Sequence, residues 1–167
     1  MELERALAAT DVLEIALRDI LREELGQTYT VSVDLSQLPP QRGGGHIEVS
    51  FGAAPENITK MSARVMQEVE RFKKDGPSED LLSKAKETAR RSYETQLKTN
   101  GYWLSRFQAV NMWGQDPVMI AHRVERINAL TTANVKEAFN KYFPSNRTTI
   151  VTLMPATAQD GASRFPR

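Results

Sequence analysis

The sequence contains no cysteine and only two histidines, His46 and His122, among its 167 residues. The lack of cysteine excludes disulfides, thiolate zinc sites, iron–sulfur clusters and cysteine nucleophiles. A catalytic zinc usually takes three protein ligands, commonly His and Glu where Cys is absent. Because the two histidines lie far apart in the chain and in unlike surroundings, we do not expect this chain to build a catalytic zinc centre by itself.

The sequence also has no excess of charge of either sign and no long apolar run. Lys and Arg total 22 and Asp and Glu total 21, so the net charge is +1. Nucleic-acid and anionic-membrane surfaces both need concentrated positive charge, which argues against either partner. No apolar run approaches the length of a membrane span. The length and the ordinary hydrophobic content of 40% predict one folded domain.

What is present is a change of hydrophobic period along the chain. Residues 2–25 repeat apolar side chains at helical spacing and end at Gly26, which can stop a helix. Residues 29–35 and 47–51 alternate between apolar and polar side chains, as half-buried strands do. A glycine- and proline-rich loop separates them. We expect an antiparallel hairpin with a long connection.

The rest of the chain favours helices. Helices are expected from Pro55 to the Gly76–Pro77 stop, from Glu79 to about Lys98, from Tyr102 to about Met112, from Asp116 and after Thr131, with Asn100–Gly101 as a break. The β-branched segment 148–153 predicts a last strand, and residues 156–167 predict a flexible tail. This order indicates an α+β fold, an antiparallel sheet with helices packed on one face.

Three local patterns have residues that chemical sites use. His122 and Glu125 share a helical face, but position 126, where an inverted zinc motif needs a second histidine, is Arg. An exposed helix face is therefore the better interpretation. His46 is better explained as a surface residue at a strand end. Residues 43–45 are glycines that lead into a strand, whereas a phosphate loop leads into a helix.

Arg22 and Tyr29 form the most informative pair. Arg22 lies in the last turn of the first expected helix, and Tyr29 begins the next strand, so the turn between them brings them near each other. Both side chains donate hydrogen bonds to carbonyl or carboxylate oxygens. A structural alternative stays open, and the residues alone favour it: Arg22 neutralises the helix C-terminus and Tyr29 packs in the core.

The segment that contains Arg22 and Tyr29 also carries a family resemblance. Residues 21–31 resemble the corresponding motif in the later domains of the pitrilysin/insulinase family of inverted-zincin zinc metallopeptidases. The likeness covers roughly residues 10 to 155 and continues, in order, at Pro55–Asn57, Glu68–Phe72, Gly76–Leu81, Ala85–Lys86, Thr99–Leu104 and Ile127–Thr131. No single piece is decisive, but the ordered set is specific.

The resemblance implies a fold and a role. Family members enclose peptides between two halves built from related α+β domains, of the half-domain fold shared with LuxS and the processing peptidases. The zinc motif His-x-x-Glu-His lies in the first half, and a domain of the second half contributes an arginine and a tyrosine that reach the substrate. By position, Arg22 and Tyr29 match that pair, as substrate-binding residues. The family also favours a bacterial periplasm or cell envelope.

The chain departs from the family pattern in two ways. It has no His-x-x-Glu-His, so we expect no peptidase activity and no bound zinc in this chain alone. It also starts at a helix where the family has earlier strands. We therefore expect residues 1–155 to be the C-terminal domain of a longer enzyme, truncated at its N-terminus and partnered by the zinc-bearing half. An open sheet edge would then favour self-association. Alternatives are a scaffold or partner subunit of the same fold, and an unrelated α+β binding module.

Overall fold

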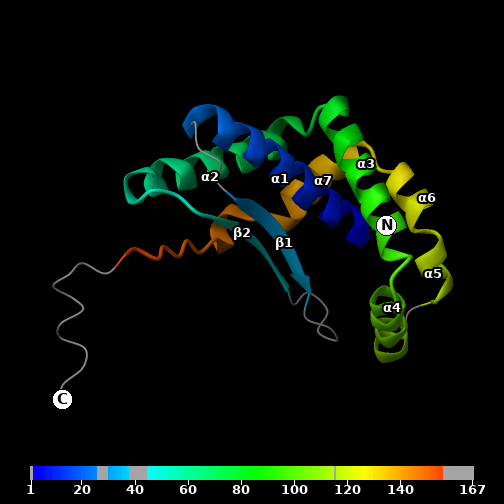
Figure 1. Ribbon diagram of the computed structural model, residues 1–167. Helices are drawn as coiled ribbons and strands as arrows, with labels where there is room; N and C mark the ends of the chain where they lie inside the picture. The colour runs from blue at the N-terminus through cyan, green and yellow to red at the C-terminus, as the bar shows by residue number, and fades with distance from the viewer. Residues whose placement is uncertain (1, 26–29, 38–44, 115, 156–167) are drawn as a thin grey trace, which may run out of the picture.

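The computed structural model describes residues 2–25, 30–37, 45–114 and 116–155, although not the side chains of residues 22–25 (Figure 1). It is rich in helices and has one antiparallel hairpin. The elements are, in order, α1 (Glu2–Leu25), β1 (Val31–Gln37), β2 (Gly45–Phe51), a 3-10 turn (Pro55–Asn57), α2 (Ile58–Asp75), α3 (Glu79–Gln96), α4 (Asn100–Trp113), α5 (Val118–Ala121), α6 (Arg123–Asn128), α7 (Thr132–Tyr142) and a second 3-10 turn (Ser145–Arg147).

Helix α1 occupies the centre of the molecule. Its leucines at positions 13, 17 and 21 recur every fourth residue, and all three are buried. The helix packs against β1 on one side and against α2, α3 and α7 on others. The expected helix over residues 2–25 is confirmed with the same bounds.

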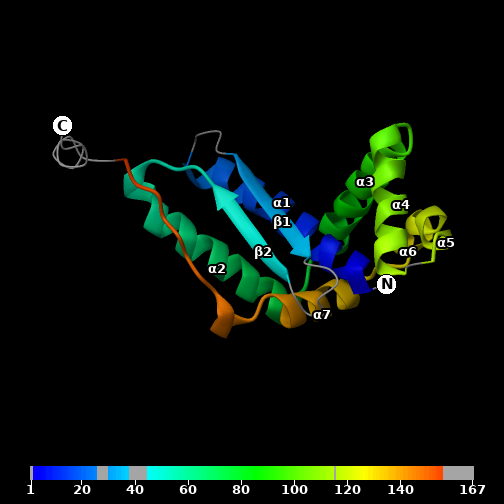
Figure 2. The same ribbon diagram turned by 90° about the horizontal axis from the view of Figure 1, so that it is seen from below.

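The hairpin shows the alternation that the sequence predicts. Val31 faces Phe51, Val33 faces Val49, and Leu35 faces Ile47 across the two strands. Val31 and Val33 are buried, whereas Asp34 between Val33 and Leu35 is exposed. Seen from below, β1 lies over α1 and α2 runs beside the hairpin (Figure 2), and the buried side chains of β1 join the core that these helices form.

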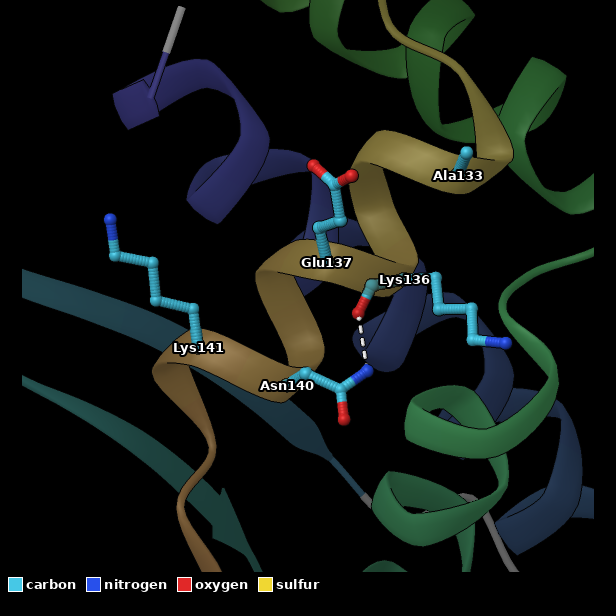
Figure 3. Close-up of a pocket in the computed structure, with 5 residues that line it drawn as sticks. All are labelled: Ala133, Lys136, Glu137, Asn140 and Lys141. Atoms are coloured by element: carbon cyan, nitrogen blue, oxygen red, sulfur yellow. Dashed lines mark hydrogen bonds between the residues drawn. The ribbon is translucent and has the colours of Figure 1, made fainter.

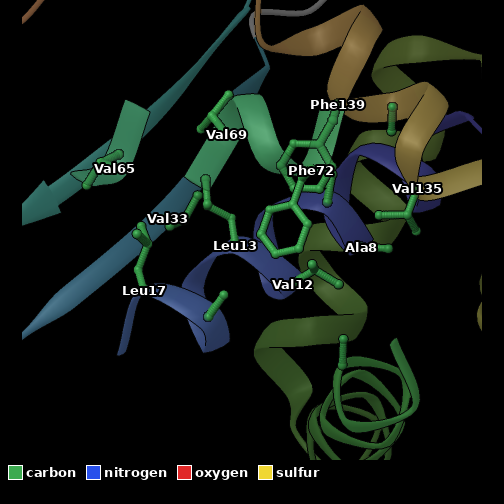
Figure 4. Close-up of a cluster of buried hydrophobic side chains, with 14 of the residues drawn as sticks. Ala8, Val12, Leu13, Leu17, Val33, Val65, Val69, Phe72, Val135 and Phe139 are labelled. Atoms are coloured by element: carbon green, nitrogen blue, oxygen red, sulfur yellow. The ribbon is translucent and has the colours of Figure 1, made fainter. Parts of the chain in front are cut away.

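One buried cluster joins the sheet to four helices (Figure 4). Phe72 of α2 and Phe139 of α7 stack at 4.8 Å between ring centroids, and neither is exposed to solvent. Leu13 of α1 and Val33 of β1 join the same cluster. Apolar side chains from distant parts of the sequence therefore close a single core, and their burial is the main driving force for this fold.

Two expectations differ from the structure at the boundary between α3 and α4. Asn100 and Gly101 form the first turn of α4 rather than a break. The interruption lies earlier, at Thr99, whose backbone is extended with φ −110° and ψ 133°. The indole Nε1 of Trp103 donates to the Leu97 carbonyl at 2.8 Å and satisfies one carbonyl that α3 leaves free at its end.

The expected last strand over residues 148–153 is wrong. This segment is not assigned to a strand, and β1 and β2 make up the sheet of the described chain. Its apolar side chains are open to solvent, with Ile150 63% and Leu153 91% exposed. The segment has the composition of a strand, but strand formation needs a paired edge, and it has none within the described residues. The expected tail, residues 156–167, lies outside the described residues.

Candidate functional site

The predicted pair of Arg22 and Tyr29 falls at the junction of α1 and β1. Arg22 belongs to the last turn of α1, but its side chain lies outside the described part of the chain, as does Tyr29. The residues on either side are placed: Leu21 is buried, with 2% exposed, and Val31 begins β1. The pair itself therefore stays a prediction.

The framework around this junction is fixed by a contact between the helix and the strand. The Val33 backbone N–H donates to Oε2 of Glu14 at 3.3 Å, and the same carboxylate pairs with Arg18. Helix and strand run in opposite directions (Figure 2). From this contact, Leu21 lies about 10 Å further along the helix and Val31 about 7 Å back along the strand. The end of α1 and the start of β1 therefore lie at the same end of the molecule.

The described residues do not fit a zinc ion. His122 Nδ1 and Glu125 Oε2 lie 2.6 Å apart on an exposed surface. Arg126 donates to the Met119 carbonyl at 2.8 Å, so it braces α5 against α6. Across the described ranges no three His, Asp or Glu side chains form a metal-binding group. His46 is also exposed, and its Nε2 lies 4.0 Å from Oε2 of Glu48.

A partly buried acidic cluster lies on α1 and was not identified from the sequence. Glu4, 6% exposed, pairs with Arg123 at 3.3 Å and Arg126 at 3.4 Å. Asp11 lies two turns further along the helix, where burial and then the nearby charge of Glu14 raise its pKa to about 6. The spacing of seven residues between Glu4 and Asp11 was the available signal, because it places both on one helical face.

Replacing Asp11 by Asn is expected to alter the pH dependence of stability. A folded pKa near 6 lies above the ordinary 3.8, so the native protein loses stability as pH rises from about 4 to 6. Asn cannot ionise, so Asp11→Asn should gain about 3 kcal/mol of stability relative to the parent between pH 4 and pH 7, since a shift of about 2 pKa units corresponds to about 3 kcal/mol. Urea unfolding across this range measures the difference. If the free energies of unfolding of the two proteins depended on pH in the same way, the raised pKa of Asp11 would be contradicted.

A shallow hollow lies on the outer face of α7 (Figure 3). Five residues from successive turns of α7 line it: Ala133, Lys136, Glu137, Asn140 and Lys141. Asn140 donates to the Lys136 carbonyl and to the Lys73 carbonyl, both at 3.0 Å. All five residues are exposed and the charges are mixed. The hollow is therefore an open helix surface rather than an enclosed ligand site.

Comparison with known proteins identifies the class. Residues 8–89, from α1 into α3, match the family model described as the peptidase M16 inactive domain. Over 166 residues the chain is 29% identical to an Arabidopsis thaliana protein named zinc protease PQQL-like, covering 90% of this chain and 17% of that protein. The chain thus spans about one-sixth of the length of this relative.

Two solved structures show the same fold. The periplasmic protease PqqL from Escherichia coli superposes with a TM-score of 0.61 and 22% identity, over 83% of this chain and 16% of that one. A protease from Helicobacter pylori gives a TM-score of 0.62 and 17% identity, over 85% of this chain and 36% of that one. The resemblance predicted from the sequence is confirmed: residues 8–89 match the inactive domain of M16 peptidases, and the chain is similar to a zinc-protease-like protein. No helix among the described residues is long and apolar enough to cross a membrane.

Proposed function

We propose that this chain is the substrate-binding, non-catalytic domain of a zinc metalloendopeptidase that hydrolyses peptides. The observation that carries the proposal is the match of residues 8–89 to the M16 inactive domain, which includes the junction with Arg22 and Tyr29. The chain has no His-x-x-Glu-His, so the zinc and the attacking water belong to another half of the protein. For the fold, we propose the α+β half-domain of the pitrilysin/insulinase family.

The proposed role of Arg22 and Tyr29 is to hold the substrate. A guanidinium presents several N–H donors in a fixed plane and a phenol presents one O–H donor. Directed at a peptide carbonyl, these groups orient the backbone and stabilise charge that develops on the oxygen. In this role neither side chain acts as a general base. The buried Leu17 and Leu21 support the role, because they hold the last turns of α1 rigidly against the core.

The alternative is a scaffold subunit that keeps the fold without a peptidase role. The described residues hold no metal-binding group, and this fits both functions equally. The coding sequence separates them. A His-x-x-Glu-His in the same reading frame supports the peptidase, and the same motif in a separate neighbouring gene supports a two-subunit enzyme. PqqL of Escherichia coli is a periplasmic protease, and we propose the same envelope location for this chain.

The full-length protein tests the substrate-binding role. Arg22→Ala should lower kcat/KM for a peptide substrate roughly 10- to 100-fold, because one positioned donor to the reacting carbonyl is lost. Zinc content, measured by atomic emission, should stay unchanged. Arg91→Ala is the matched control: Arg91 lies on α3, away from the junction, is 77% exposed and pairs with Glu87. Equal turnover in the parent and in Arg22→Ala would contradict the assigned role.

A further inference from the structure

Helix α4 carries apolar side chains on the face turned away from the rest of the fold. Trp103, Leu104 and Phe107 are 37%, 63% and 53% exposed, and Ala109 is the buried residue of this helix. At 100° per residue, Trp103, Leu104 and Phe107 share one face, about 160° from Ala109, whereas the exposed Met112 and Trp113 lie on other sides of α4. In both views α4 lies at the end of the molecule opposite α2 (Figures 1 and 2). We call Trp103, Leu104 and Phe107 the α4 stripe.

The α4 stripe is held in place by a ladder of aromatic rings. The ladder starts at Tyr93, which is buried and donates to the Ile120 carbonyl at 2.6 Å. Tyr102 contacts Tyr93 edge-on at 6.0 Å and Trp103 at 5.8 Å, and Trp103 stacks on Phe107 at 5.9 Å. The indole is further fixed by its hydrogen bond to Leu97. Exposed rings that are already ordered lose little entropy on binding.

The size and composition of the α4 stripe are those of an interface centre. The three exposed side chains present on the order of 300 Å² of apolar surface, within the range of the largest patch on a typical monomer, which is often functional. Trp, Tyr and Arg dominate interface hot spots, and α4 carries Trp103, Tyr102 and Arg106. Apolar anchors one helical turn apart are how a helix binds in a groove.

Charge indicates what kind of surface covers the stripe. Residues 95–115 contain Lys98 and Arg106 and no acidic residue. A second copy of α4 is disfavoured, because both helices would bring the same basic side chains and neither would supply a carboxylate from residues 95–115. A groove with an apolar floor would complement the stripe, and carboxylates on its rim would complement Lys98 and Arg106.

We infer that α4 inserts its stripe into such an apolar, acid-rimmed groove on the remainder of the full-length polypeptide. This inference rests on the proposed function, in which the domain works beside a zinc-bearing half. The Arabidopsis relative supports it, because about five-sixths of that protein lies outside the region that matches this chain. A groove on the same chain also meets α4 at high effective concentration, so a small apolar contact is sufficient for binding.

Hydroxyl-radical labelling read by mass spectrometry tests the inference. Leu104 and Phe107 should be labelled several-fold more slowly in the full-length protein than in the 167-residue chain. Phe72, which is not exposed, should be protected in both and reports that the chain is folded. Equal labelling of Leu104 and Phe107 in the two proteins would overturn the inference. Protection already present in the short chain, together with a dimer in sedimentation, would assign the stripe to a second copy and overturn it as well.

A matched pair of variants locates the contact. In the full-length protein, Leu104→Ser should return Phe107 to the labelling rate of the short chain. Met112→Ser should not, although Met112 is more exposed, at 73%, because it lies on another side of α4. Neither substitution disturbs the core, so Phe72 stays protected. Identical behaviour of the two variants would contradict the assigned face. The full-length sequence tests the proposed function separately. If it contains no His-x-x-Glu-His and α4 is still protected from labelling, the proposed function is rejected and this inference is retained.

Discussion

Phe72→Ala should lower the free energy of unfolding of this chain by about 3–5 kcal/mol, the usual cost of removing a fully buried aromatic ring. Phe72 stacks on Phe139, and the Arg71 guanidinium lies 4.3 Å from its ring centroid on an exposed side of α2. Alanine would leave a cavity where α1, α2 and α7 meet, and a packed interior collapses only partly around such a space. Urea unfolding followed by circular dichroism measures the loss.

Phe107→Ala is the control for that substitution, since it removes the same ring from a side chain that is 53% exposed. In this chain it should change the free energy of unfolding by no more than about 0.5 kcal/mol. If Phe72→Ala and Phe107→Ala cost the same, the core described for this fold is incorrect.

Gly76→Ala is expected to cost about 3 kcal/mol, at the upper end of the range for a strained backbone. Gly76 ends α2 with φ 77° and ψ 176°, a conformation that essentially only glycine adopts. An added Cβ would also lie 3.3 Å from the Cβ of Lys136 on α7, closer than ordinary contact. The alternatives for the chain are to bear the strain or to separate α2 from α7, and both destabilise it.

Gly101→Ala is the matched substitution, because Gly101 lies in the first turn of α4 with nothing within 4 Å of an added Cβ. It should be neutral or stabilise the chain by about 0.5 kcal/mol, since alanine is the better helix former. Thermal unfolding compares the two variants. A Gly76→Ala protein as stable as Gly101→Ala would show that the conformation at position 76 is not constrained.

The elements predicted correctly are those whose apolar period is decided locally. The stripe of α2 at Met61, Val65, Val69 and Phe72 is buried as helical spacing predicts, and Ser78 caps α3 by accepting from the Leu81 N–H at 3.2 Å. The hairpin follows from alternation in the same way. In each case the sequence signal lies within one element, and the tertiary contact only selects which face is covered.

The predictions that fail or stay open depend on partners outside the element. Residues 148–153 have strand composition, but composition does not provide a neighbouring strand. Trp103 and Phe107 lie one turn apart on α4, and periodicity alone does not tell whether that side of a helix faces inward or outward. The roles of Arg22 and Tyr29 come from the family resemblance, because two polar residues near a turn do not by themselves define a substrate site.

The first turn of α1 is anchored by residues near the other end of the chain. Glu2 pairs with Lys141, Arg5 with Glu137 at 3.2 Å, and Glu4 with Arg123 and Arg126. During synthesis α1 leaves the ribosome before α6 and α7, which hold it, have been made. The central helix must therefore wait with its leucine face uncovered, and such an exposed apolar surface makes a nascent chain prone to aggregation and a client for chaperones.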